Sequence, residues 1–212
     1  HWILKEYKDD RGELLDLVPS SLPPDAPLPF TLRVDDARVT AALNQSFYKL
    51  SSAAGPQIDA TTQPTAVIFE LETADGVKAR KSFAFEPSSF IVQFTANVQQ
   101  GSEALNPTIE WGPGLGDEIA RSQSGSFLSP SYLYRAQAIY HLDGSVTRTA
   151  STSLGQGTTR DGVFRWAGVD DHYFISAVLQ PQGSTRLEYR EVTLPVTTTN
   201  PPQTTHYVAD AV

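Results

Sequence analysis

Two carboxylates and a histidine that could do chemistry lie together in the C-terminal third of the chain. Asp170, Asp171 and His172 stand directly before an apolar run. A carboxylate pair can cleave a glycosidic bond, but adjacent residues of an extended chain point to opposite faces, so this use requires a bulge. Asp170 and His172 can share a face as an Asp–His dyad, although no nucleophile is identifiable among the many Ser and Thr residues. We favour a dyad that fixes a turn.

A glycine-rich segment invites comparison with phosphate-binding loops. Gly112, Gly114 and Gly116 alternate with other residues. The segment lacks the Lys-Ser/Thr of a P-loop and the spacing of a dinucleotide fingerprint, and no clear helix follows it. We therefore expect a tight strand exit in which glycines adopt positive φ.

The histidines and cysteines give no sign of a metal centre. The chain has no cysteine, which excludes disulfides and thiolate metal sites. None of His1, His141, His172 and His206 has metal-ligand spacing such as H-E-x-x-H. We expect structural or surface roles for these histidines, no metal, no cofactor and no catalytic residue.

Aromatic residues offer the one candidate for a ligand groove. Trp111 and Trp166, aided by tyrosines at positions 132, 134 and 140, could stack against a sugar. We assign the candidate groove to Trp111, Trp166, His172 and Tyr173. Packing in the core is the competing explanation, and we favour it for most of these rings.

Net charge argues against polyanionic partners. The 212 residues carry a formal net charge of −8, with a sequence pI near 4.9 and no basic run. Binding to nucleic acid requires clustered Lys and Arg, and broad docking on an anionic lipid surface requires the same. The sequence therefore predicts neither partner.

The elements that position these residues are mainly β-strands. The apolar run 173–179 is broken only by Ser176 and ends before Pro181. Such a run predicts a strand buried on both faces, so we place it in the centre of the fold with alternating strands around it.

Alternation is strongest in an antiparallel meander. Apolar residues alternate through 67–71 and 77–85 on either side of a tight Asp75–Gly76 turn, and a third strand follows at 90–98. In this third strand Phe90 and every second residue to Val98 belong on the buried face, and Ile91 on the outer face. A second Asp-Gly turn, at residues 143–144, joins strands 132–141 and 146–150.

The remaining chain predicts short strands, proline-rich loops and one weak helix. Residues 37–43 form the helical candidate, capped by Asp35 or Asp36. The other predicted strands are 2–7, 14–18, 30–34, 47–50, 109–111, 186–192 and 206–212. The predicted loops are 19–29, 51–64, 117–130 and 195–202. We predict one all-β domain over residues 1–212, a large antiparallel β-sandwich with little helix.

Four segments carry a family resemblance. They are residues 2–7 followed by 14–19, then 90–98, then 109–116, and last 166–181, which reads Trp-Ala-Gly-Val-Asp-Asp-His-Tyr-Phe and ends at Pro181. In this order and spacing they resemble the large periplasmic domain of the YidC-type membrane protein insertases of Gram-negative bacteria. The resemblance spans nearly the whole chain.

The resemblance implies a fold and a role. The fold would be similar to galactose mutarotases and carbohydrate-binding sandwiches. The family inserts and helps fold inner-membrane proteins, alone or beside the Sec translocon, and insertion belongs to a membrane core. This chain would be a non-catalytic module at the periplasmic face of the inner membrane. Its partners would be Sec accessory subunits and nascent membrane proteins, and membrane contact would be made only by segments absent from it. The lack of an initiator Met and of any run near the ~18 apolar residues of a membrane span favours a piece of a multi-spanning protein.

A second hypothesis belongs to another class of protein. The chain could be a secreted carbohydrate-binding module or a mutarotase-like epimerase. Mutarotases use histidines and a glutamate around the sugar, and that set cannot be placed here. A reading frame that continues past Val212 into apolar spans supports the insertase, whereas a stop codon there and a cleavable signal upstream support the carbohydrate hypothesis.

Overall fold

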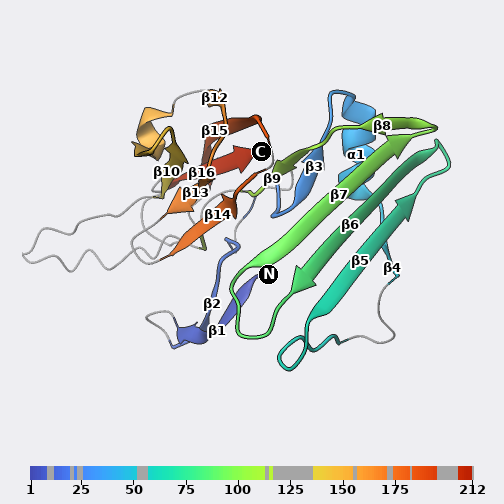
Figure 1. Cartoon of the computed structure of the whole chain (residues 1–212), viewed down its shortest axis with the longest axis horizontal. Helices are drawn as coiled ribbons and strands as arrows, with labels where there is room; N and C mark the ends of the chain where they lie inside the picture. The colour runs from blue at the N-terminus through green and yellow to red at the C-terminus, as the bar shows by residue number, and fades with distance from the viewer. Residues whose placement is uncertain are drawn as a thin grey trace, which may run out of the picture. The chain divides into compact units, whose positions relative to one another are not determined.

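The computed structural model describes residues 1–8, 12–19, 22, 26–51, 57–112, 115–116, 136–154, 157–170, 174–181, 183–194 and 205–211. The chain divides into two compact units, one made of His1–Phe30 and Glu110–Val212 and the other of Thr31–Ile109. Figure 1 shows that both are built almost entirely of strands, and the strand pairs among the described residues are antiparallel. The predicted all-β antiparallel fold class is confirmed.

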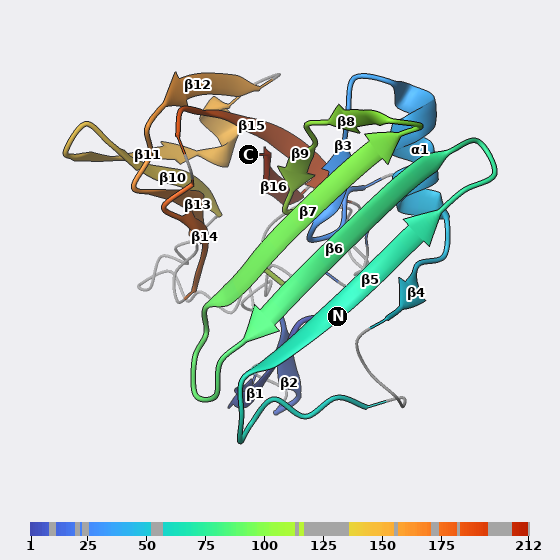
Figure 2. The same ribbon diagram turned by 45° about the vertical axis from the view of Figure 1, so that its right-hand side comes forward.

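The unit Thr31–Ile109 contains a five-stranded antiparallel sheet in the order β4-β5-β6-β7-β8. Its strands are β4 (Lys49–Leu50), β5 (Thr65–Glu72), β6 (Val77–Phe85), β7 (Val92–Gln100) and β8 (Glu103–Leu105). Figure 2 shows the three long strands side by side. The predicted meander is therefore present, whereas β8 was not predicted.

Two hairpin turns differ in length. Thr73 N–H donates to the Val77 carbonyl (2.9 Å), so three residues, 74–76, lie between this bonded pair, and the last is Gly76 with φ of 79°. The predicted two-residue turn at Asp75–Gly76 is wrong, because a turn followed by a left-handed glycine also fits this sequence. The predicted turn at Asp143–Gly144 is confirmed, since both residues have positive φ (50° and 77°), as a type I′ turn requires.

One α-helix belongs to the unit Thr31–Ile109 and packs against its sheet. Helix α1 (Ala37–Gln45) begins after Asp36, whose side chain accepts hydrogen bonds from the backbone of Arg38 (2.8 Å) and Val39 (3.4 Å). These N–H groups have no partner within a helix, so the cap stabilises its first turn, and the same bonds lower the pKa of Asp36. The helix is confirmed and is two residues longer than predicted. It contacts β6 and β3 (Thr31–Arg33), and β3 lies beside β9 (Thr108–Glu110).

The core of this unit lies between α1 and the sheet. Val39 and Leu43 of the helix are buried at 1% and 0% exposure. The buried cluster comprises Leu32, Val39, Leu43, Leu71, Val77, Ala79 and Val98. Alternate residues of β5, β6 and β7 therefore face inward, as the period of two requires.

The other unit contains a two-stranded sheet, a four-stranded sheet ordered β11-β10-β13-β14, and the strands β12, β15 and β16 side by side. The bounds are β1 (Ile3–Lys8), β2 (Leu14–Asp16), β10 (Gln137–Leu142), β11 (Ser145–Ala150), β12 (Thr158–Gly162), β13 (Trp166–Asp170), β14 (Ile175–Leu179), β15 (Thr185–Leu194) and β16 (Thr205–Ala211), with a short 3-10 helix at Ser151–Ser153. Strand β12 was not predicted. The predicted excursion at 117–130 lies outside the described residues.

A tyrosine hydroxyl connects two layers of this unit. Tyr189 of β15 is 1% exposed. Its hydroxyl accepts from the Gly168 N–H (3.0 Å) and lies 2.8 Å from the Ile139 carbonyl and 2.9 Å from the Gly168 carbonyl. Ile139 of β10 and Gly168 of β13 are directly opposite partners. The hydroxyl therefore occupies a position in the β10–β13 ladder. The surrounding buried cluster comprises Leu115, Ala136, Ala138, Leu154, Phe164, Ala167, Val169, Leu187 and Tyr189.

The strand predicted to lie at the centre lies at an edge. Strand β14 is the last of its sheet, and Ile175, Val178 and Leu179 are 55%, 37% and 51% exposed. The prediction that residues 173–179 are buried on both faces is wrong. The buried central strand is β13, whose Ala167, Gly168 and Val169 are all buried. An apolar run does not distinguish the middle of a sheet from an unprotected edge, since both lack polar alternation.

The residue predicted to begin the buried face of β7 is exposed. Phe90 is 81% exposed and precedes β7, as does Ile91 at 58%. The preceding turn explains this. Ser89 N–H donates to the Glu86 carbonyl (3.3 Å), Ser88 has a φ of 58°, and the Ser89 hydroxyl accepts the Ile91 N–H (3.0 Å). The period of two therefore begins only at Val92.

Candidate functional site

The two tryptophans of the predicted ligand groove belong to separate aromatic sets. The Trp111 ring centroid lies 6.1 Å from that of Trp2 and 5.4 Å from that of Phe30, and the latter two lie 5.8 Å apart. Trp166 instead lies 6.0 Å from the ring of His141. The other two members, His172 and Tyr173, lie outside the described residues. The groove stays a prediction, and packing accounts for these ring contacts.

Asp170, the one member of the predicted dyad that the structure describes, forms an ion pair. Asp170 Oδ2 lies 3.1 Å from Arg148 Nε, and its side chain is 18% exposed. Asp170 closes β13 and Arg148 lies on β11, on the other side of β10, so the pair connects strands across the sheet. Asp171 and His172 lie outside the described residues, so the dyad itself remains a prediction.

The glycine segment is a close backbone crossing. Gly112 and Gly116 have φ of 103° and 83°, which confirms the predicted positive φ at both. A Cβ on Gly112 would lie 2.5 Å from the Pro27 carbonyl oxygen, and one on Gly116 would lie 2.6 Å from the Asp16 carbonyl oxygen. Only glycine fits positions where another backbone approaches this closely. Gly114 lies outside the described residues.

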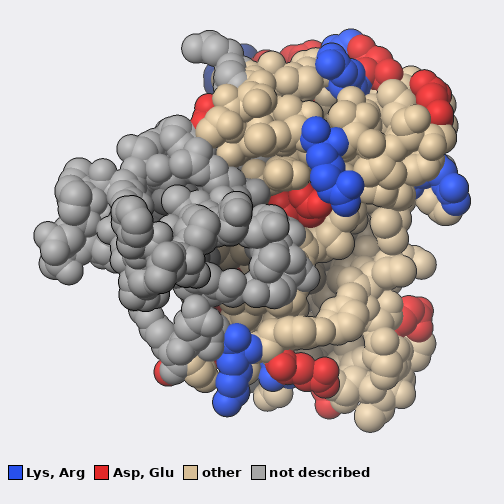
Figure 3. All heavy atoms as spheres, turned by 90° about the vertical axis from the view of Figure 1, so that its left-hand side faces the viewer, with Lys and Arg blue, Asp and Glu red and all other residues tan. Residues whose placement is uncertain are grey.

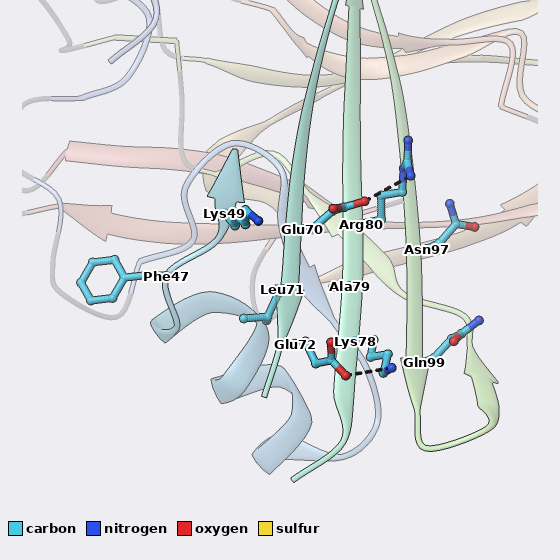
Figure 4. A pocket seen from close by; sticks show the side chains of 10 residues that line it. All are labelled: Phe47, Lys49, Glu70, Leu71, Glu72, Lys78, Ala79, Arg80, Asn97 and Gln99. Atoms are coloured by element: carbon cyan, nitrogen blue, oxygen red, sulfur yellow. Dashed lines mark hydrogen bonds and ion pairs between the residues drawn. The ribbon is translucent and has the colours of Figure 1, made fainter. Parts of the chain in front are cut away.

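The polar face of the meander forms an open concave surface. Its volume is about 660 Å³, and Figure 4 shows the lining side chains on β4, β5, β6 and β7, with Phe47 on the segment before β4. We call it the ladder surface. It is lined by the outward-facing Glu70, Glu72, Lys78, Arg80, Asn97 and Gln99, by Phe47 and Lys49, and by Leu71 and Ala79, which are otherwise buried in the core.

Cross-strand register sets the chemistry of the ladder surface. Glu70 lies opposite Arg80 and Glu72 opposite Lys78, and both pairs form ion pairs, at 3.2 Å and 2.8 Å. Across the next strand, Asn97 faces Arg80 and Gln99 faces Lys78. Each row thus presents an acid, a base and an amide. Such exposed pairs add little stability, but they offer a partner many donors and acceptors.

Two residues at the rim were not foreseen. Phe47 is 99% exposed, and Lys49 of β4 has no ion-pair partner among the residues that the structure describes. With Lys49, the ladder surface has three cations and two carboxylates, in a chain whose net charge is −8. The outward positions of Lys78 and Arg80 were predicted from alternation. The sequence predicts a strand over 47–50, whereas β4 begins only at Lys49, and nothing in the local sequence indicates that the Phe47 side chain is exposed.

A comparison with known protein families decides what kind of domain this is. The family model described as the YidC periplasmic domain matches residues 2–211. The chain belongs to this family. The resemblance carried by residues 2–7, 14–19, 90–98, 109–116 and 166–181 is thereby confirmed. Comparisons with curated proteins and with solved structures found no match.

Membership in this family indicates the location and the class of protein to which the domain belongs. It is the periplasmic-side domain of an insertase, a class of protein associated with membrane insertion rather than with catalysis. In the part of the chain that the structure describes, no helix is long and apolar enough to cross a membrane. Among the same residues, no group of three or more His, Asp or Glu side chains is arranged to hold a metal ion.

A lysine lies on the inner face of the meander of the YidC periplasmic domain. Lys81 is opposite Phe69 and Ala96, and its Nζ lies 5.1 Å from the centre of the Tyr48 ring. Burial lowers the pKa of Lys81 to about 8, and burial raises the pKa of Tyr48 to about 12. The face of the Tyr48 ring favours the cation and opposes part of the effect of burial. In the sequence, Lys81 has the same alternation as the apolar Ala79 and Phe83, and this is the signal that places it on the inner face.

Charge on the visible surface is mixed. Figure 3 shows Lys and Arg side chains lying singly or near Asp and Glu, with no contiguous basic patch among the described residues on that face. This mixture agrees with the negative net charge of the YidC periplasmic domain.

Proposed function

We propose that this YidC periplasmic domain is a non-catalytic interaction module that contacts Sec accessory subunits and nascent membrane proteins. The observation that carries the proposal is the family match over residues 2–211. Membrane insertion makes and breaks no covalent bond. It needs contacts that bind a segment of the inserted polypeptide and then release it. A domain that serves it therefore needs surfaces that bind other polypeptides.

The ladder surface supports a role in polypeptide contact. Its acids and bases neutralise one another across strands, at Glu70–Arg80 and Glu72–Lys78. Interfaces combine such a polar rim with aromatic anchors, and Phe47 supplies an exposed ring at the edge of this surface. The uncompensated Lys49 would favour an acidic group on the partner.

Binding to Sec components tests the proposal directly. The chain is immobilised, and the purified periplasmic portions of the Sec accessory subunits from the same organism are titrated over it in biolayer interferometry. We expect saturable binding. The variant Phe47→Ala tests the rim anchor, with Val146→Ala, an exposed apolar residue on β11, as the matched control. No binding by any Sec subunit would contradict the assigned partners.

A sugar titration tests the competing carbohydrate function. Common hexoses are added while tryptophan fluorescence is followed, and mutarotation is measured by polarimetry. We expect no turnover and no saturable fluorescence change. Micromolar binding that Trp166→Ala abolishes in a folded protein would support the carbohydrate-binding module or epimerase instead.

A further inference from the structure

Strand β14 is the uncharged edge of a sheet. It pairs with β13 through five consecutive residues, from Asp170↔Ile175 to Trp166↔Leu179, without a bulge. Among the described residues, nothing pairs with its other side. Figure 2 shows β14 as the last of the strands β11, β10, β13 and β14. A strand in this position presents backbone N–H and C=O groups to any chain that can align with it.

The direction of these backbone groups follows from one hydrogen bond. Gln180 N–H donates to the Arg165 carbonyl on the β13 side (2.8 Å). Backbone groups alternate along a strand, so Ser176 and Val178 also point toward β13. The N–H and C=O groups of Ile175, Ala177 and Leu179 therefore point toward the open edge.

Other sheet edges of this molecule are protected and β14 is not. Natural proteins protect edges with charge, proline, bulges or very short strands. Every other described edge strand contains a charged residue, and these include Lys5 of β1, Asp16 of β2, Arg33 of β3, Lys49 of β4, Glu103 of β8, Arg148 of β11 and Arg160 of β12. Strand β14 has the sequence Ile-Ser-Ala-Val-Leu, with neither charge nor proline.

The exposed side chains of β14 define the chemistry of an occupant. Ile175 and Leu179 lie on one face on either side of the small Ala177, and Val178 lies on the other face. An added strand would cover apolar surface on both faces of the sheet while its main chain bonds to the edge. A segment with charges at its central positions would leave them against these side chains without partners.

We propose that β14 is the acceptor edge for an extended apolar segment of another polypeptide, which binds as an added antiparallel or parallel strand. This rests on the proposed function and deepens it, because it names where an apolar segment is received. Charge argues against a second copy as the occupant, since each chain carries −8 and pairing through this edge would bring two such chains together.

A labelled peptide provides the probe. The peptide is Ser-Ser-Val-Thr-Ile-Thr-Val-Ser-Ser, neutral and blocked at both ends, with a fluorophore on one terminus for anisotropy. The control peptide has the same sequence with its central amides N-methylated, which removes main-chain donors and keeps the side chains. We expect saturable binding of the first peptide and at least about tenfold weaker binding of the second, as expected for the loss of one or two hydrogen bonds.

Variants locate the site on the protein. Ala177→Pro removes an N–H that points to the open edge, a position where edge strands tolerate proline, and Leu179→Lys adds the missing edge charge. Val163→Lys is the matched control, because Val163 is 68% exposed and lies outside any strand. We expect the two edge variants to weaken binding at least about tenfold and the control to stay within about twofold. Circular dichroism and urea titration confirm that each variant is folded.

Amide hydrogen exchange in the wild-type chain gives a readout that needs no variant. On peptide binding, the amides of Ile175, Ala177 and Leu179 should exchange more slowly, while those of Ser176 and Val178, already bonded to β13, should not change. Unchanged exchange along β14, equal binding of the methylated peptide, or edge variants that bind as wild type each overturn the proposal. Sedimentation that shows a dimer abolished by Ala177→Pro overturns it in favour of a second copy.

The outcomes separate this inference from the proposed function. If Sec subunits bind but the peptide does not, the proposed interaction module is supported and the β14 edge is contradicted. If the peptide binds at β14 but Sec subunits do not bind, the β14 edge is supported and the assigned Sec partners are contradicted.

Discussion

At the scale of single residues, Lys81 is a cationic side chain on a face that is otherwise apolar and largely buried. It lies on the inner face of the meander beside Phe69, and its pKa falls to about 8. The folded-state pKa is lower than the ordinary lysine value of 10.5, so the charged form destabilises the fold below pH 8. This loss disappears as the pH rises from about 8 toward 10.5.

Lys81→Met should stabilise the protein at neutral pH. The expected gain is about 1–2 kcal/mol, because partial solvation and the Tyr48 ring reduce the cost of the charge. Urea titrations at pH 7 and about pH 9.5 check this, and the gain should shrink at the higher pH. Above pH 10 the raised pKa of Tyr48 lowers stability in both proteins, so the comparison stops below it. Lys78→Met, on the outer face of the same strand, is the control and should change stability by less than about 0.5 kcal/mol. A destabilised Lys81→Met would show that the cation contributes more than its burial costs.

Tyr189→Phe isolates the hydroxyl within the β10–β13 ladder. The substitution keeps the ring and leaves buried backbone groups of Ile139 and Gly168 without this partner. We expect a loss of about 1–3 kcal/mol in the free energy of unfolding. Tyr140→Phe, in the same core, removes a hydroxyl that forms no hydrogen bond with the residues that the structure describes, and should be nearly neutral. Equal effects in thermal or urea unfolding would mean that the inserted hydroxyl carries no special role.

At the scale of elements, the pairing of β13 and β14 depends on one glycine. A Cβ on Gly168 would lie 1.9 Å from the Ser176 carbonyl oxygen and 2.6 Å from the Ala177 Cα. Both are backbone atoms, so the strand itself would have to move. Close approach of this kind is a reason for glycine inside a strand.

Gly168→Ala should therefore separate β14 from its sheet. We expect a loss of about 3 kcal/mol or more in unfolding free energy, and faster amide exchange at Ser176 and Val178. Gly162→Ala is the matched strand control. Its Cβ would meet only the Leu142 side chain, with Cδ1 nearest at 2.7 Å, and this side-chain end can rotate away. The control should cost less than about 1 kcal/mol. Unaltered exchange in β14 would show that the strand adapts without moving.

At the scale of the whole molecule, net charge limits the partners. The chain carries −8 at neutral pH, and the visible face has mixed charge. We expect no retention on duplex DNA or on vesicles rich in anionic lipid, even at about 50 mM salt, where charge attraction is strong. Co-sedimentation measures this, with a basic protein of similar size as the positive control. Binding that weakens as salt rises would reveal a basic surface.

The sequence by itself determined the family, the all-β class and the local elements with period two. Alternation placed Lys78 and Arg80 outward, Asp36 capped the only predicted helix, and the Asp143–Gly144 turn followed from its residue types. These features depend on interactions between neighbours in the chain, so neighbouring residue types suffice to specify them.

Tertiary structure decided which strands became central and which side chains stayed exposed. Residues 173–179 read as a core strand, yet β13 occupies the centre, because its Gly168 lets Tyr189 and β14 approach closely. The same holds for Phe47 and Phe90, which are apolar but uncovered. Burial depends on what packs against a residue from distant parts of the chain, and sequence periodicity contains no information about that partner.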